Sequence, residues 1–194
     1  MEEPMIDIQN INDNIKDLFS PCNTCVYWEA PEKCERVTEN EAFTIKKKWF
    51  EKTRAFGDCG KLLYVDGSPK AYCQYGPPHL LENVGAYTDI CPVSPDAVLI
   101  SCLYVLKGYR NKNLGTTLLL AVVTDIRERG YCAVETYARD DSPNNCSGPT
   151  AFYLKNRFRI LKSKKWGSAV FSLVRCDLKV RVSTPDRPVD VYEH

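Results

Sequence analysis

The residues from Leu103 to Leu119 carry the clearest chemistry in the chain, because an apolar run there changes into a helix through a short polar turn. In such a turn, free main-chain N–H groups and the positive end of the helix dipole converge on one point. Arg110 and Lys112 add positive charge beside it. The segment is not a Walker loop, because it lacks the glycine-lysine-serine/threonine ending. It is not a dinucleotide fingerprint either, because it lacks three spaced glycines. It therefore predicts an anion site suited to a pyrophosphate.

Strand-like and helix-like segments alternate around this turn, which indicates α/β or α+β architecture. Residues 97–106 are almost entirely apolar, as in a central strand that is covered on both faces. A helix over 113–129 follows, with apolar residues at steps of four and Gly130 at its end. Lys46 to Lys48 are expected on a solvated helix face. The other expected strands are 5–9, 25–29, 61–65, 70–75, 131–138, 158–161 and 168–178, and the other expected helices are 12–19, 39–56 and 148–156.

The composition limits the classes of protein to which the chain can belong. The chain has 194 residues, 44% of them hydrophobic, with a formal net charge of +1. This length predicts one domain, which can bury a core without disulfides or metals. With no basic block and no long apolar run, we expect no nucleic-acid partner and no membrane partner. We expect a soluble, cytoplasmic protein with a single domain over residues 1–180 and a tail or edge extension over 181–194.

Ten cysteines are the unusual part of the composition. Most stand singly in apolar runs, where a reduced thiol behaves as a small hydrophobic group. Only Cys22, Cys25 and Cys34 cluster, and a zinc site built on them needs a fourth ligand. Neither His79 nor His194 is spaced as that partner. We expect no metal and take buried or loop thiols as the default, with metal binding at these three cysteines left open.

The polar turn resembles motif A of the GNAT superfamily of acyl-CoA-dependent N-acetyltransferases, which reads Arg or Gln, two variable residues, Gly, one variable residue, then Gly or Ala. Asn113 replaces the first glycine, and asparagine is the non-glycine residue that best tolerates a left-handed backbone. Residues 151–158 resemble the family's helix that carries a tyrosine, here Tyr153, with Arg157 replacing a family glycine. The Cys-x-x-Cys-Val-Tyr-Trp-Glu segment at 22–29 resembles a bacterial and archaeal branch of this family. The motif A residues are Arg110, Asn111, Lys112, Asn113, Leu114 and Gly115, followed by Thr116.

The resemblance implies a mixed, mostly antiparallel central sheet that is flanked by helices and splayed between the strands at about 97–106 and 131–138. The exposed backbone of Leu103, Tyr104 and Val105 would pair with the pantetheine arm of coenzyme A. Residues 110–116 would bind the pyrophosphate through main-chain N–H groups, and Asn144 would touch the pantetheine. An N–H at or beside Val105 would stabilise the oxyanion, a contribution of ~3 kcal/mol.

Two side chains are expected to move protons in the reaction that the resemblance implies. Tyr153 would protonate the departing thiolate, since a phenol has a reference pKa near 10, close to that of a thiol. Glu135, in an apolar strand where burial could raise its pKa, is the predicted base. Glu29 lies in a similar setting, and either carboxylate could equally be a paired structural group.

These features predict an N-acetyltransferase that uses acetyl-CoA as co-substrate and acts, as a monomer or homodimer, on a small-molecule or peptide amine by direct attack on the thioester. The alternative is a GNAT-like protein that binds an acyl-CoA as a sensor or interaction module and transfers nothing. Asn113 and Arg157, which replace family glycines, motivate that alternative. The acceptor is set in this family by loops of the first half, whose sequence does not identify it.

Overall fold

The structure is a computed structural model that describes residues 4–140 and 146–178. Its centre is a seven-stranded sheet in the order β1-β2-β3-β4-β5-β7-β6. Strands β4 and β5 pair in parallel, and every other neighbouring pair is antiparallel. The expected mixed, mostly antiparallel sheet is therefore confirmed. The strands are β1 (Ile6–Asn10), β2 (Gly60–Val65), β3 (Ser68–Gly76), β4 (Ala97–Val105), β5 (Ala133–Arg139), β6 (Arg159–Trp166) and β7 (Ala169–Asp177).

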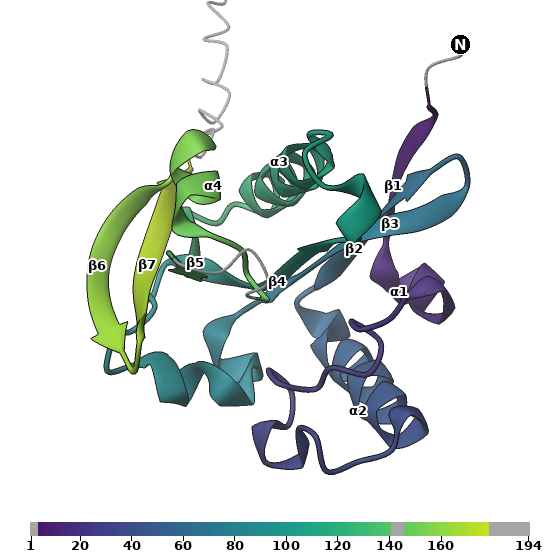
Figure 1. Ribbon diagram of the computed structural model, residues 1–194, viewed down its shortest axis with the longest axis horizontal. Helices are drawn as coiled ribbons and strands as arrows, with labels where there is room; N and C mark the ends of the chain where they lie inside the picture. Colours follow the sequence, from purple (N-terminus) through teal and green to yellow (C-terminus); the bar gives the residue numbers. More distant parts are fainter. Residues whose placement is uncertain (1–3, 141–145, 179–194) are drawn as a thin grey trace, which may run out of the picture.

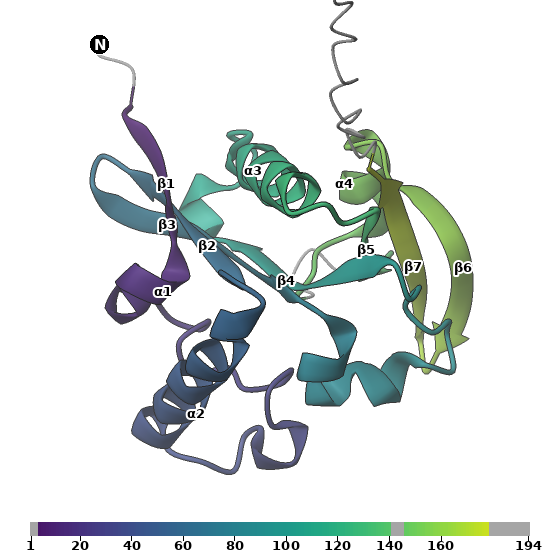
Figure 2. The ribbon, with the colours of Figure 1, turned by 180° about the vertical axis from the view of Figure 1, so that it is seen from behind.

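Helices cover both faces of the sheet (Figures 1 and 2). Helices α3 (Leu114–Glu128) and α4 (Thr150–Lys155) lie on one face, while α1 (Ile11–Asn14) and α2 (Glu39–Lys52) lie on the other. Each face has its own apolar core, and β4 contributes Ile100 to the core on the α3 side and Leu99 to the core on the α2 side. The apolar run 97–106 is thus a strand covered on both faces, as expected. Short 3₁₀ segments occupy Ile15–Asp17, Pro31–Lys33, Thr53–Ala55, Pro78–Leu80, Glu82–Tyr87 and Lys107–Tyr109.

Strands β4 and β5 stay together only at their beginnings. Ala97 to Leu99 pair with residues 133–135, and no register pair follows the pair Leu99 and Glu135. The expected splay between these strands is present, and it lies beside the turn that leads into α3. None of the helices in residues 4–140 and 146–178 is long and apolar enough to cross a membrane.

Residues 25–29 contain no strand, so the expected strand there is wrong, and residues 27–29 form a turn. The main-chain N–H groups of Glu29 and Ala30 both donate to the carbonyl oxygen of Val26, at 3.2 and 2.9 Å. The Trp28 ring stacks on the Tyr87 ring, with centroids 5.2 Å apart. Burial of this aromatic ring against the segment 82–87 overrides the strand propensity of the sequence.

Lys46 is buried, which corrects the expectation of a solvated face at this residue, whereas Lys47 and Lys48 are exposed as expected. Its ammonium donates to Oε1 of Glu29 at 2.6 Å and to Oε1 of Gln74 at 3.0 Å. Burial alone would lower the pKa of Lys46, but the charge and hydrogen bond of Glu29 outweigh it and hold that pKa above its ordinary value. Glu29 therefore keeps a fully buried lysine charged. The buried stripe of α2 consists of Ala42, Lys46, Trp49 and Phe50.

Candidate functional site

A cavity of about 430 Å³ lies where the end of β4, the turn before α3 and the start of α4 meet. Its volume is in the range of small-molecule sites. Every predicted cofactor-binding residue lines it except Lys112, which is absent from the walls, and Asn144, which lies outside the described residues. The walls also hold residues that were not predicted. The complete lining is Leu103, Tyr104, Val105, Tyr109, Arg110, Asn111, Asn113, Leu114, Gly115, Thr116, Gly148, Pro149, Phe152 and Lys155.

The turn into α3 presents main-chain donors to this cavity. Asn111 and Asn113 both have a φ of 60°, so the expected left-handed backbone at Asn113 is confirmed. The first helical hydrogen bond runs from the N–H of Thr117 to the carbonyl oxygen of Asn113, at 3.0 Å. The N–H groups in the first turn, those of residues 114–116, precede that bond and have no acceptor within the helix. These N–H groups are the donors on which the predicted anion site depends.

Positive charge flanks these donors. Nε of Arg110 donates to the carbonyl oxygen of Val105 at 3.0 Å, which ties the turn to the end of β4. Lys155, on α4, lines the opposite wall and was missed, because a lone lysine beside Tyr153 gives no motif in the sequence. Lys112 instead places its ammonium 5.2 Å from the centre of the Tyr109 ring. Arg110 and Lys155 are therefore the cationic side chains in the walls of the cavity.

Gly115 lies close to two apolar side chains of the cavity wall. A Cβ atom built on Gly115 would lie 3.4 Å from Cε2 of Phe152 and 3.6 Å from Cγ2 of Val105. Those distances are ordinary contacts for a methyl group, but a longer side chain would have to displace Phe152 or Val105 or extend into the cavity. The glycine therefore lets the start of α3 pack closely against these two residues of the cavity wall.

We predict that Gly115→Leu weakens coenzyme A binding at least about ten-fold, which corresponds to ~1.4 kcal/mol. The backbone of Gly115 is helical, and leucine is a better helix former, so the fold is expected to persist. Titration calorimetry with coenzyme A checks the affinity, and circular dichroism checks the fold. Gly115→Ala is the matched control and should bind with nearly the wild-type affinity. Equal affinity for the leucine variant would contradict a ligand in this cavity.

Tyr153 lies beside the cavity but outside its walls. Its side chain is fully buried, and its ring packs against that of Phe152, with centroids 5.1 Å apart. The hydroxyl donates to the carbonyl oxygen of Ser147. Burial raises the pKa of Tyr153 well above its ordinary value, so in this conformation the phenol gives up its proton less readily than a free phenol does. The phenol lies next to the cavity with its hydrogen directed at the main chain.

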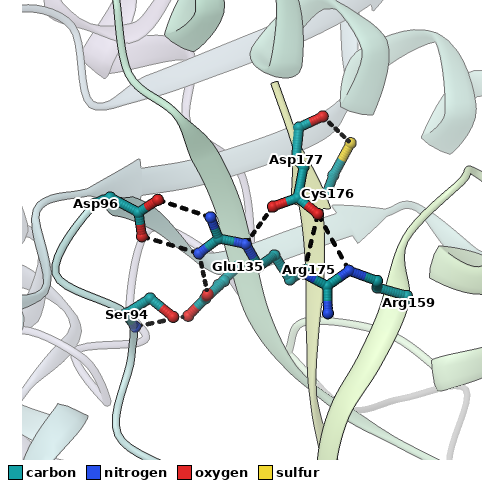
Figure 3. Close-up of polar contacts among 7 residues, drawn as sticks. All are labelled: Ser94, Asp96, Glu135, Arg159, Arg175, Cys176 and Asp177. Carbon is teal, nitrogen blue, oxygen red and sulfur yellow. Dashed lines mark hydrogen bonds and ion pairs between the residues drawn. The ribbon is translucent and has the colours of Figure 1, made fainter. Parts of the chain in front are cut away.

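The geometry does not support Glu135 as the base. Oε1 of Glu135 accepts from Arg175 at 2.9 Å, and Oε2 accepts from the main-chain N–H of Ser94 at 2.9 Å (Figure 3). The same guanidinium binds Asp96 and Asp177. Glu135 is fully buried and lies where β4 and β5 are still paired. This carboxylate fixes the connection into β4, because both of its oxygens are engaged in structural contacts.

Glu29, the other carboxylate considered, is held through Oε1 by Lys46 and by Nε2 of Gln74, the latter at 2.7 Å. Its Oε2 is buried and has no hydrogen-bond partner within the described part of the chain. Sequence spacing could not predict these contacts, because Glu29, Lys46 and Gln74 come from a turn, a helix and a strand.

The end of β4 is less exposed than expected. The N–H of Leu103 donates to the carbonyl oxygen of Cys146 at 2.8 Å, so this donor already has a partner from the chain itself.

The ten cysteines are free thiols. Among the residues that the structure describes, no three His, Cys, Asp or Glu side chains form a group that could hold a metal ion, and Cys22, Cys25 and Cys34 are no exception.

The sheet is mixed and opens between two parallel strands, next to a polar turn at the start of a helix. This arrangement is typical of the GNAT fold. The chain matches the model of the acetyltransferase (GNAT) family over residues 13–155 and belongs to that family. The predicted resemblance is therefore confirmed. The likeness of residues 22–29 to one branch stays a prediction. A search of curated proteins finds no match.

Solved structures share the fold at low sequence identity. The PaiA N-acetyltransferase from Thermoplasma acidophilum, in complex with coenzyme A, is 15% identical with a TM-score of 0.56, covering 89% of this chain and 99% of that chain. YncA, a putative acetyltransferase from Salmonella typhimurium with its cofactor acetyl-CoA, is 14% identical with a TM-score of 0.56, covering 93% and 98%. An N-acetyltransferase from Staphylococcus aureus Mu50 is 17% identical with a TM-score of 0.56, covering 92% and 100%.

Proposed function

We propose that this protein transfers an acetyl group from acetyl-CoA to an amine. The observation that carries the proposal is the cavity at the end of β4, where β4 separates from β5. The main-chain N–H groups in the first turn of α3 and the side chains of Arg110 and Lys155 lie at this cavity. Membership in the acetyltransferase family supports it, as do the coenzyme A and acetyl-CoA complexes of structurally similar proteins.

The residues in the walls fit the parts of such a ligand. The N–H groups of residues 114–116 would bind the pyrophosphate, and Arg110 and Lys155 would balance its charge. The apolar side chains of Phe152 and Val105, which line the cavity beside Gly115, would contact the pantetheine arm. Residues 103–105 of β4 would guide that arm toward the gap between β4 and β5.

The reaction then needs one donor for the developing oxyanion and one proton for the leaving group. The neutral amine nitrogen attacks the thioester carbonyl carbon, the C–N bond forms, and the C–S bond breaks. The nitrogen gives up one proton to solvent water, and solvent restores the proton that Tyr153 donates. A main-chain N–H of β4 would stabilise the negative charge on the carbonyl oxygen. Tyr153 would donate its proton to the departing thiolate once its hydroxyl leaves the carbonyl of Ser147.

Ligand binding tests the first half of this proposal. Coenzyme A at about 100 times its Kd is expected to stabilise the protein by ~2.7 kcal/mol. For a chain of this size that corresponds to a rise in Tm of roughly 5–11 °C in differential scanning calorimetry. AMP, which lacks the pyrophosphate and the pantetheine, is the control and should produce a much smaller rise. No rise with coenzyme A or acetyl-CoA would contradict the proposal.

Turnover tests the second half. Free coenzyme A should be released when acetyl-CoA is mixed with a panel of amines and peptides. One observation favours a second candidate function, a sensor that binds an acyl-CoA without transferring it, because the Tyr153 hydroxyl is engaged by the main chain. Tight binding without thiol release across the panel would identify that function.

A further inference from the structure

A short segment of the chain lies in the gap between β4 and β5. Beyond the last strand pair, Leu99 and Glu135, residues 146–148 contact both strands. The carbonyl oxygen of Cys146 accepts from the N–H of Leu103 on β4 at 2.8 Å. The carbonyl oxygen of Gly148 accepts from the N–H of Arg139 on β5 at 3.3 Å. We call residues 146–148 the inserted segment.

Ser147 fixes the inserted segment at its middle. Its hydroxyl is buried and donates to the carbonyl oxygen of Tyr137 on β5, and its own carbonyl oxygen accepts from the hydroxyl of Tyr153. Two consecutive carbonyl oxygens, those of Cys146 and Ser147, are thus bound by a main-chain N–H of β4 and by a buried phenol. The proposed reaction requires donors of these two kinds, a main-chain N–H of β4 for the oxyanion and the Tyr153 hydroxyl for the leaving thiolate.

The inserted segment also meets the cavity. Gly148 and Pro149 form part of the cavity wall, so a ligand that fills the cavity touches the end of the segment. Gly148 has a φ of +87°, a backbone conformation that lets the chain turn sharply at this point. The segment is small and held by polar contacts, which a ligand with amide and carbonyl groups can replace one for one.

We propose that residues 146–148 act as an internal occupant of the acyl-CoA site, latched by Ser147, and that acetyl-CoA binds by displacing them. This proposal rests on the proposed function. It implies that the competent state, with Leu103 N–H and the Tyr153 hydroxyl free, is a minor fraction of the unliganded protein. The apparent Kd is then the intrinsic Kd divided by that fraction.

Removing the hydrogen bond from Ser147 to Tyr137 should therefore strengthen the binding of acetyl-CoA. Ser147→Ala removes the hydroxyl that donates to Tyr137, and one neutral hydrogen bond shifts such an equilibrium by about two- to ten-fold. We expect the Kd for acetyl-CoA, measured by titration calorimetry, to fall by that factor. Structural damage alone would raise the Kd, so the direction of the change is diagnostic. Ser172→Ala is the matched control, because this buried serine lies on β7 and its hydroxyl bonds that of Ser163. The Kd of this variant should stay at the wild-type value.

Displacement can also be observed without a substitution. Burial raises the pKa of the Cys146 thiol to about 12, which keeps it unreactive in the unliganded protein. Acetyl-CoA has no free thiol, so alkylation by N-ethylmaleimide can be followed site by site by mass spectrometry in its presence. We expect saturating acetyl-CoA to speed alkylation of Cys146 at least about ten-fold, as the thiol regains an ordinary pKa. Cys73, fully buried in the core, should stay slow in both conditions.

The outcomes separate the two proposals. A lower Kd for Ser147→Ala with faster Cys146 alkylation supports the displacement. Wild-type binding of acetyl-CoA with an equal or higher Kd for a folded Ser147→Ala overturns it, while the proposed function stands. If Ser147→Ala does not fold, an unchanged alkylation rate at Cys146 overturns it instead. Absence of acetyl-CoA binding in every variant removes the proposed function and the displacement together.

Discussion

Replacing Tyr153 with phenylalanine is expected to lower kcat for acetyl transfer by about 10²- to 10⁴-fold, the usual contribution of a positioned acid. The phenol is protonated at neutral pH, and its ring packs against that of Phe152 at the side of the cavity. The variant keeps the ring and loses only the proton donor. It also loses the hydrogen bond to the Ser147 carbonyl, so acetyl-CoA should bind no more weakly than to the wild type.

Initial rates and titration calorimetry separate these two effects. Tyr75→Phe is the matched control, because Tyr75 is also buried and its hydroxyl donates to Asp125 at 2.7 Å on the α3 side of the sheet. That variant should lose some stability and keep kcat. Unchanged turnover in Tyr153→Phe would remove this residue as the acid. A loss of affinity equal to the loss of turnover would assign it to binding instead.

The second large effect concerns stability. Glu29→Ala should lower the free energy of unfolding by about 3–5 kcal/mol, because it leaves the ammonium of Lys46 buried without its counter-charge. Because Glu29 raises the pKa of Lys46, this contribution is present at neutral pH. It is lost only as the pH rises through the folded-state pKa, above the ordinary lysine value of about 10.4. Urea unfolding at neutral pH measures the difference.

Two variants show whether the charge is the cause. The double variant Glu29→Leu with Lys46→Met replaces the pair by apolar groups and should recover most of the lost stability. Asp89→Ala removes the partner of an exposed ion pair with Lys164 and should cost less than about 1 kcal/mol. A loss below about 1 kcal/mol in Glu29→Ala would mean that Lys46 does not depend on this carboxylate.

Motif A was predictable because it is local. Residues 110–116 are consecutive, and a strand end followed by a helix start fixes where their N–H groups lie whatever the rest of the chain does. The left-handed asparagine at position 113 follows from the same local geometry. The apolar run of β4 likewise predicts a strand covered on both faces. These features account for most of the cavity lining.

The proton-transfer groups were harder to predict, since their roles depend on contacts across the fold. Glu135 looks like a buried base in the sequence, but Arg175 comes from 40 positions further along the chain and binds it. Lys46 reads as part of a solvated run until Glu29 and Gln74 meet it. The turn at residues 27–29 replaces a strand because Trp28 packs on Tyr87.

The sequence by itself determined the family, the order of strands and helices around the site, and the polar turn that leads into α3, because these depend on neighbouring residues and on hydrophobic periodicity. Only the tertiary structure decided which polar groups are occupied. It pairs Glu135 with Arg175, buries Lys46 against Glu29, and directs the Tyr153 hydroxyl and the Leu103 N–H at residues 146–148. The physical reason is that a buried polar group must find a partner, and that partner is chosen by proximity in space, which a linear sequence does not record.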